Sequence, residues 1–166
     1  MVELVSVAAL SANRVVGLDG GIPWPSLPED RAQYRALVAA DPVILGRRTF
    51  DTMRDDLPGS EQMVVSQSLT TVDVSTARVV SGVDEAIAAL DETDTSVGYV
   101  LGGGAIYRLF QPHVDRMTLS HVPGEYEGDA VYPAWDEAEW TVVREAPHDG
   151  FTLREWVRQG SQRPEM

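Results

Sequence analysis

The sequence contains no cysteine and no lysine. Without cysteine, disulfide bonds and thiolate metal ligands are both excluded. The apolar runs are all shorter than the roughly 18 residues that a membrane-spanning helix needs. The amino terminus is also unlike a signal peptide, because the acid Glu3 stands where a basic segment is required. We therefore expect a soluble cytoplasmic protein that has no membrane partner.

Positive charge is scarce. The chain has 26 aspartates and glutamates against 13 arginines, which gives a formal net charge of −13. So much negative charge repels the phosphates of nucleic acids, so no nucleic-acid partner is expected. It also strains the compact state unless salt screens it, which indicates a salt-rich cytoplasm. Disorder is the alternative, but 43% of the residues are hydrophobic and regularly patterned.

At 166 residues the chain is long enough for one core, and we predict a single domain over residues 1–166. The expected strands are residues 2–10, 42–45, 62–66, 78–80, 97–101, 117–122, 140–144 and 151–157. The expected helices are residues 27–40, 46–55, 84–90 (capped by Ser81) and 105–110. Residues 13–21 read as a glycine-rich turn and 67–76 as a surface loop. This order predicts an α/β fold with a central, mostly parallel eight-stranded sheet, an antiparallel C-terminal strand and about four flanking helices.

A rigid loop leads into the first helix. The segment Ile22–Tyr34 holds three prolines and a tryptophan, most of them before the helix begins. Proline fixes its own φ and restricts the preceding residue, so this loop loses little conformational freedom on folding. Ser26 and Glu29 have the spacing of a capping box, which predicts that their side chains close the first turn.

Asp30 lies in the first turn of that helix, on its apolar face. The residues that share this face at helical spacing are Tyr34, Leu37 and Val38. The residues expected on the wetter side are Glu29, Arg31 and Gln33. An acid in a first turn can simply be favoured by the helix dipole. An acid beneath an apolar pocket can instead deliver a proton or bind an amidine-like group. The pattern alone leaves both interpretations open.

Two strand–glycine–helix junctions indicate phosphate-binding sites. Gly46–Thr49 carries two arginines, and both guanidinium groups and the free N–H groups of a helix start attract anions. We favour a phosphate-bearing ligand here over simple surface charge, because basic residues are so few. Gly102–Gly104 repeats the geometry, although its spacing is not a Rossmann fingerprint. In the first strand, Ala8 and Ala9 leave room for either a flat ligand or a closely packed helix.

Taken in order, these motifs resemble those of dihydrofolate reductases over nearly the whole chain. The matching segments are the opening strand followed by residues 13–17, then 22–24, 27–30, 46–49, 57–59, 102–107 and 127–129. The resemblance implies NADPH-dependent reduction of dihydrofolate to tetrahydrofolate, with hydride transfer to C6 and protonation of N5, in one-carbon and thymidylate metabolism. It also implies that antifolate-type inhibitors bind. We expect a monomer without a metal site.

The resemblance assigns roles at the substrate end. Asp30 would hold the pterin and help to deliver the proton through water, Trp24 would order that water, and Ser120 would support Asp30. The other residues implied to contact the substrate are Val7, Ala8, Tyr34 and Leu57, with Arg35 or Arg54 at the glutamate tail.

The cofactor end draws on more of the chain. The residues implied to contact nicotinamide, its ribose and the pyrophosphate are Ala9, Val15, Val16, Gly17, Leu18, Asp19, Gly20, Gly21, Ile22, Leu101, Gly102, Gly103, Gly104, Ala105, Ile106 and Tyr107. The residues implied at the adenosine phosphates and adenine are Gly46, Arg47, Arg48, Thr49, Ser66, Gln67 and Ser81. The resemblance further implies a cis peptide bond between the first two glycines of the 102–104 run.

The chain departs from the family pattern in three places. Ser60 stands where an arginine usually holds the α-carboxylate of the substrate. Ser66 and Gln67 lack the arginine that many members place at the 2′-phosphate, so a preference for NADPH would depend on Arg47 and Arg48. The third departure is Ser81, where some members have a lysine.

Three other functions are to be weighed. A reductase of the same fold acting on a pyrimidine ribityl phosphate would share the glycine motifs but lack the tryptophan-to-aspartate arrangement of residues 24–30. A non-catalytic nucleotide- or pterin-binding module would not need an acid at position 30. A soluble α/β domain with some other role is the least specific alternative.

Overall fold

The computed structural model describes residues 2–159. Within this range the chain forms ten strands, four α-helices and one short 3-10 helix. The strands are β1 (Glu3–Ser11), β2 (Val15–Gly17), β3 (Pro42–Gly46), β4 (Glu61–Val65), β5 (Ala77–Val80), β6 (Val97–Val100), β7 (Arg116–Val122), β8 (Ala130–Val131), β9 (Trp140–His148) and β10 (Phe151–Arg158). The helices are α1 (Pro28–Val38), α2 (Arg47–Thr52), α3 (Val83–Asp91), α4 (Gly104–Phe110) and the 3-10 helix η1 (Gln111–His113).

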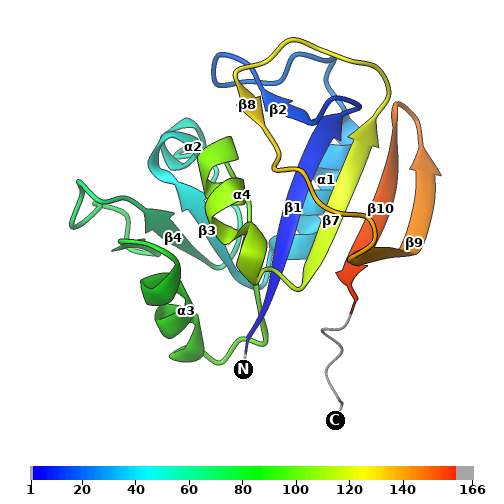
Figure 1. Ribbon diagram of the computed structural model, residues 1–166. Coiled ribbons are helices and arrows are strands. Elements are labelled where there is room, and N and C mark those ends of the chain that lie inside the picture. Colours follow the sequence, from blue (N-terminus) through cyan, green and yellow to red (C-terminus); the bar gives the residue numbers. More distant parts are fainter. Residues whose placement is uncertain (1, 160–166) are drawn as a thin grey trace.

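Eight strands form one sheet in the order β5-β4-β3-β6-β1-β7-β10-β9 (Figure 1). Every pair from β5 to β7 is parallel, whereas β10 runs antiparallel to both β7 and β9. The predicted sheet, its antiparallel C-terminal strand and the four flanking helices are therefore confirmed. Ligands of open α/β sheets bind outside the carboxyl ends of the parallel strands, so this edge is the first place to look for a site.

Side chains are buried on both faces of the sheet. Helix α1 lies behind the sheet in the view of Figure 1, and α3 and α4 lie in front of it. The front cluster includes Leu90 of α3 and Phe110 of α4, and the rear cluster includes Val38 of α1 and Phe50 of α2. A strand covered on both sides, such as β3, therefore consists almost entirely of apolar residues. Among residues 2–159, no helix is long and apolar enough to cross a lipid bilayer.

Both predicted side-chain caps are wrong. Helix α1 begins without a side-chain cap, and the Glu29 carboxylate instead lies 3.2 Å from Nδ1 of His148, a long-range partner that takes it away from the helix start. Helix α3 begins after Gly82, also without a side-chain cap. Ser81 does not cap this helix with its side chain; instead, its backbone N–H donates to the Glu85 carboxylate at 2.7 Å.

The predicted glycine-rich turn contains a short strand. Strand β2 pairs antiparallel with β8, more than a hundred residues later, and the two form a separate sheet above the main one (Figure 1). After β2, the chain turns back between Leu18 and Gly21, whose backbones exchange two hydrogen bonds of 2.9 Å. Gly128 allows the second strand to approach, since a Cβ there would lie 2.2 Å from the Val15 side chain.

Candidate active site

A cleft of about 320 Å³ lies between α1 and the rear face of the sheet. Its predicted members are Val7, Ala8, Ala9, Asp30, Tyr34, Leu101, Tyr107 and Ser120. Seven further residues line it that were not predicted as site residues: Gln33, Leu37, Met53, Thr118, Arg144, Leu153 and Glu155. The cleft therefore brings together substrate-end and cofactor-end residues from β1, α1, α4 and β7.

Asp30 is fixed in the cleft by the sheet. The Ser120 hydroxyl of β7 donates a short hydrogen bond to the Asp30 carboxylate, across 90 positions of sequence. Ser120 is buried, and the β1–β7 register places it opposite Ala9, which also lines the cleft. The helix dipole is therefore not the only interaction at this acid, because a side chain from another element orients it.

The proline loop is anchored by its tryptophan. Trp24 is 4% exposed and packs in a cluster with Val122, Phe151 and Leu153, while Tyr126 meets it edge-on with ring centroids 5.7 Å apart. Trp24 does not itself line the cleft, although Leu153 of the same cluster does. The loop is thus held to the sheet next to the point where it delivers Asp30.

Tyr107 connects the cleft to the glycine run. Its buried hydroxyl lies 2.7 Å from the Val7 carbonyl oxygen and 2.9 Å from that of Leu101. Burial raises the pKa of Tyr107 well above its ordinary value, so the phenol is a neutral donor. Gly102 has a φ of 110°, and a Cβ there would lie 2.9 Å from the Tyr107 ring. The Gly102–Gly103 peptide bond is cis, as the resemblance implied.

The two strand–glycine–helix junctions lie side by side at the carboxyl edge. The N–H of Gly46, the last residue of β3, donates to the Gly102 carbonyl after β6 at 2.9 Å. A Cβ built on Gly46 would lie 3.0 Å from the Ile106 side chain, and one on Gly103 would lie 3.6 Å from the Thr49 hydroxyl. The first N–H groups of α2 and α4 have no partner within their own helices. This edge therefore presents backbone N–H groups with little side-chain bulk in front of them.

The other predicted phosphate residues continue along the same edge. Ser66 and Gln67 follow β4, and Ser81 follows β5, the next two strands in order. The Ser66 N–H donates to the Val80 carbonyl at 3.0 Å, and its hydroxyl accepts from the Leu69 N–H at 3.1 Å. Residues from four neighbouring strand ends thus form one extended row, long enough in principle for a dinucleotide.

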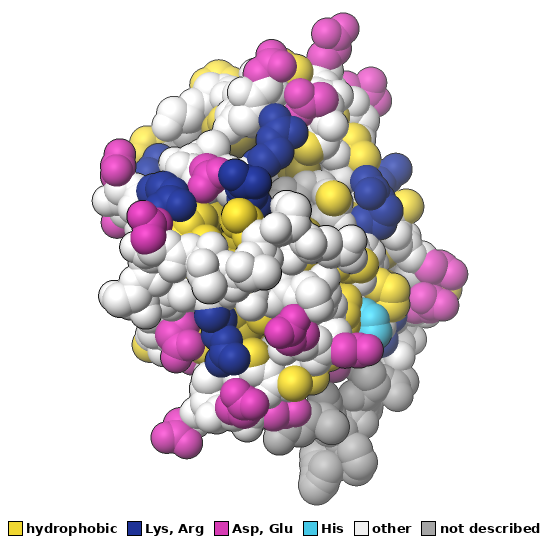
Figure 2. All heavy atoms as spheres, turned by 90° about the vertical axis from the view of Figure 1, so that its left-hand side faces the viewer, with side chains coloured by type: hydrophobic (Ala, Val, Ile, Leu, Met, Phe, Trp, Pro, Cys, Tyr) yellow, Lys and Arg dark blue, Asp and Glu magenta, His cyan; other side chains and the backbone are white. Residues whose placement is uncertain are grey.

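Both arginines at this edge are exposed, and one of them is paired with an acid. Nε of Arg47 lies 3.6 Å from the Asp51 carboxylate one helical turn later, and both side chains are about half exposed. Arg48 is exposed beside it. Figure 2, which views the molecule from the side of α2 and α3, shows arginine side chains standing among acidic ones.

The two arginines proposed for the substrate tail differ in their surroundings. Arg54 lies 3.3 Å from Asp51 and 3.2 Å from Asp73, and its guanidinium covers the Phe50 ring. Arg35 donates to the Asp56 backbone carbonyl at 2.8 Å and lies 3.5 Å from the Asp56 carboxylate, and its side chain is only 21% exposed. Arg35 thus stays close to the 56–57 turn, whereas Arg54 is turned toward the 73 loop.

The segment before the proline loop holds the rest of the predicted cofactor residues. Asp19 has a φ of 52°, and its N–H donates to the Asp129 carboxylate at 3.0 Å. Leu18 and Ile22 expose apolar side chains, at 37% and 50% of their surface. None of residues 15–22 lines the cleft itself. The segment lies beside the glycine junctions because β2 pairs with β8, and β8 is in contact with Gly104. A Cβ added to Gly104 would lie 3.2 Å from the backbone of β8.

Some of the cleft residues that the sequence analysis did not predict could have been found from local spacing, and others depend on the register between distant strands. Gln33 was expected on the wetter side of α1, yet it lines the cleft, and its buried Nε2 atom has no hydrogen-bond partner within the described range 2–159. Its spacing of three from Asp30 could have found it. Thr118 could have been found by strand alternation from Ser120. Arg144 and Glu155 depend on the β9–β10 register, which the sequence does not give.

This architecture defines an α/β protein that can hold an extended ligand along the carboxyl edge of its sheet, with one oriented carboxyl group at the end of the cleft. A family model described as dihydrofolate reductase matches residues 3–153. Dihydrofolate reductase 1 of Haloarcula marismortui is 38% identical, covering 98% of this chain and 94% of the relative. Dihydrofolate reductase HdrB of Haloferax volcanii is 33% identical over 95% of this chain and 84% of its own.

A solved structure of dihydrofolate reductase from Enterococcus faecalis, complexed with NADP(H) and RAB-propyl, superposes with a TM-score of 0.82. The two chains are 24% identical, and the superposition covers 95% of this chain and 96% of the other, so it confirms the fold. This protein belongs to the dihydrofolate reductase family.

Proposed function

We propose that this protein reduces dihydrofolate to tetrahydrofolate with NADPH. The observation that carries the proposal is the hydrogen bond from Ser120 to Asp30 in a cleft whose lining extends to Leu101, the residue before the second glycine junction. A ribityl-phosphate reductase or a binding module needs no carboxyl group held in this way. The family membership of the chain supports the same reaction.

Asp30 carries the proton chemistry in this proposal. With one carboxylate oxygen accepting from Ser120, the group keeps further lone pairs for the amidine-like edge of a pterin, and a bidentate contact of this kind fixes the ring in its plane. A carboxyl group in this position can also hold the water that protonates N5. Trp24 contributes by fixing the loop that leads to Asp30, since its ring is buried against the sheet.

The walls of the cleft orient the reacting rings. Val7, Ala8 and Ala9 of β1 form a low floor, and Tyr34 of α1 stands over it with Leu57 packed nearby. Apolar walls bind planar rings through surface burial, and holding two rings in contact lowers the entropic part of the barrier. When bound, NADPH supplies the hydride.

The carboxyl edge fits the remainder of such a cofactor. Glycines at 46 and 102–104 leave the backbone accessible, and small or polar residues follow β4 and β5. We assign the 2′-phosphate to Arg47 and Arg48, because no other arginine lies in this row of the described residues. Free N–H groups and guanidinium groups are the usual partners of phosphate.

Arg35 is the better candidate for the glutamate tail. It is partly buried and is held at Asp56 by the backbone carbonyl at 2.8 Å and by the more distant, exposed carboxylate at 3.5 Å, so part of its five N–H groups stays available. Arg54 is already engaged by two carboxylates. We further propose that the protein works as a single-domain monomer in the cytoplasm, and that its charge of −13 reflects a salt-rich one, in line with the two relatives named above.

The test is the loss of NADPH absorbance with dihydrofolate as substrate, measured from low salt to several-molar salt. We expect turnover that rises with salt as the acidic surface is screened. A pyrimidine ribityl phosphate serves as the control substrate and should give no turnover. Absence of dihydrofolate reduction at every salt concentration would refute the proposed function.

A further inference from the structure

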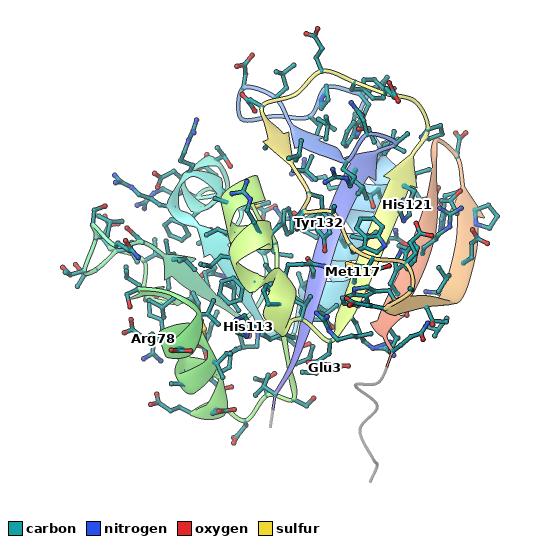
Figure 3. All side chains as sticks on the ribbon, in the orientation of Figure 1. Glu3, Arg78, His113, Met117, His121 and Tyr132 are labelled. Carbon is teal, nitrogen blue, oxygen red and sulfur yellow. The ribbon has the colours of Figure 1, made fainter. Side chains whose placement is uncertain are left out.

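A second cavity, of about 560 Å³, lies on the opposite face of the sheet from the cleft. Its floor includes Leu10, His121 and Trp156, whose neighbours along the strands face the cleft. Its outer wall is the segment between β8 and β9, which crosses in front of β1 and β7 (Figure 1). Figure 3 shows His121 and Tyr132 on this front face, away from α1. Nothing in the proposed reaction uses the cavity.

Aromatic rings form one wall. Trp135 meets Trp156 with ring centroids 5.3 Å apart and His121 at 6.4 Å. The indole Nε1 of Trp156 lies 3.3 Å from Nε2 of His121. An indole can only donate, so this histidine nitrogen accepts and the proton sits on Nδ1. Burial lowers the pKa of His121 to about 4, which keeps the ring neutral at ordinary pH.

The polar groups of the cavity are mainly donors. Arg14 is held at the wall because its guanidinium donates to the Tyr132 carbonyl, while its own carbonyl accepts from the Tyr132 N–H at 2.7 Å. Arg154 lies 2.6 Å from the Glu145 carboxylate. Each of these contacts uses only part of a guanidinium with five N–H groups. The Nε1 atom of Trp135 is buried and has no partner among residues 2–159.

Carboxylates contribute less to the lining of the cavity than arginines do. Glu137 is the one carboxylate that lines it within the described residues, and it is exposed to solvent, where its charge is screened; Glu145 lies beside the lining as the partner of Arg154. Two arginines thus line a cavity in a chain that has only 13 basic residues in all. The volume lies within the range of roughly 300–1,000 Å³ that small-molecule sites occupy.

From these observations we propose that this cavity binds a small planar aromatic carboxylate. Its ring lies against Trp135 and Trp156, and its carboxylate is held by Arg14 and Arg154. The two requirements are complementary, since the apolar walls favour a ring and the excess of donors favours an anion. Because the cavity and the cleft lie on opposite faces of the sheet, both can be occupied at once.

The test uses 2-naphthoate as the probe, titrated into the full chain in high salt and followed by calorimetry and by the indole N–H signals in a nitrogen–proton correlation spectrum. We expect saturable one-to-one binding with a Kd of about 1 mM or tighter, from an affinity of roughly 0.3 kcal/mol per ligand atom. The Trp135 indole signal, assigned through Trp135→Phe, should shift on binding.

The Kd of the probe for three variants tests where it binds. Arg154→Gln should weaken binding about tenfold, the loss expected when one charge-assisted contact is removed. Arg78→Gln is the matched control, since it removes an exposed arginine from the far edge of the sheet (Figure 3) and should leave the Kd unchanged. Tyr34→Ala alters the cleft and should also leave it unchanged.

The neutral analogue 2-naphthamide should bind about tenfold more weakly than 2-naphthoate. Absence of saturable 2-naphthoate binding would overturn the proposal, as would equal affinity in Arg154→Gln or loss of binding in Tyr34→Ala. All of these readouts are independent of turnover, so they stand or fall separately from the proposed reaction.

Discussion

The acid end of the proposed ligand site, at Asp30 in the cleft, and its proposed phosphate end, at Arg47 on the carboxyl edge of the sheet, hold their charged groups in different ways. At the acid end, Asp30 is partly buried and receives a hydrogen bond from the buried Ser120 of the sheet. At the phosphate end, Arg47 is exposed on a short helix and lies beside Asp51, which partly neutralises it. An exposed ion pair is worth about 0–1 kcal/mol and weakens in salt, whereas a buried hydrogen bond to a charged group is worth about 1.5–3 kcal/mol.

This difference predicts that the acid end acts mainly on kcat and the proposed phosphate end mainly on KM. A carboxyl group fixed by a strand loses little freedom when the substrate arrives, so its effect should appear in kcat. Exposed arginines, of which Arg47 must leave an acid to reach a phosphate, should affect mainly KM, in a salt-dependent way. The four predictions below test that separation, from the largest expected effect to the smallest.

Asp30→Asn should lower kcat at neutral pH by a factor of about 10² to 10⁴, the usual contribution of a positioned general acid or its relay. The amide keeps the size of the side chain but cannot carry the proton. NADPH consumption with saturating dihydrofolate measures the loss. Glu29→Gln is the control, because it removes the neighbouring carboxylate, which faces His148 instead of the cleft. A variant at position 30 with wild-type kcat would show that the acid end has no chemical role.

Arg35→Gln should raise KM for dihydrofolate about tenfold with little change in kcat, because a tail contact acts equally in the ground state and the transition state. Arg54→Gln is matched in chemistry and lies on the same side of the molecule, but its charge is already engaged by Asp51 and Asp73. It should change KM by less than about twofold. A larger effect at Arg54 than at Arg35 would reverse the assignment of the tail.

The acid end was also the more predictable one, though only in part. Helical spacing alone placed Asp30 on the correct face of α1, since a helix face depends on residues close in sequence. Ser120 came from the resemblance, because its contact with Asp30 depends on the β1–β7 register and no local pattern encodes that. The prediction was wrong for Gln33, which was assigned to the wetter side because it is polar, although its spacing of three from Asp30 agrees with its place in the cleft.

Long-range contacts explain the other failures. The Ser26–Glu29 capping box does not form because Glu29 pairs with His148, 119 positions away by the difference of the two residue numbers. Strand β2 was read as a turn because its partner β8 lies far along the chain and local glycines dominate the pattern. The mostly parallel pairing of the large sheet was predictable, since alternating strands and helices favour parallel neighbours.

Arg47→Ala should raise KM for NADPH about fivefold and leave KM for NADH nearly unchanged, because the two cofactors differ only in the 2′-phosphate. Arg48→Ala on the same helix start provides the matched comparison and shows how the charge is shared between the two arginines. The NADPH effect should shrink as salt increases, since the contact is exposed. Equal changes for both cofactors would place Arg47 outside the phosphate site.

Asp51→Asn should lower KM for NADPH about twofold. Asp51 lies within 3.6 Å of Arg47 and 3.3 Å of Arg54, so it competes with a phosphate for the same positive charge. Removing that competitor frees a guanidinium that an exposed pair holds by less than about 1 kcal/mol, and hence the effect is small. Asp55→Asn, one turn further on and outside these pairs among the described residues, makes the same change in net charge and should leave KM unaltered. If the two variants lower KM equally, relief of general repulsion by the −13 chain is the cause, and the phosphate end is governed by net charge and not by the Arg47–Asp51 pair.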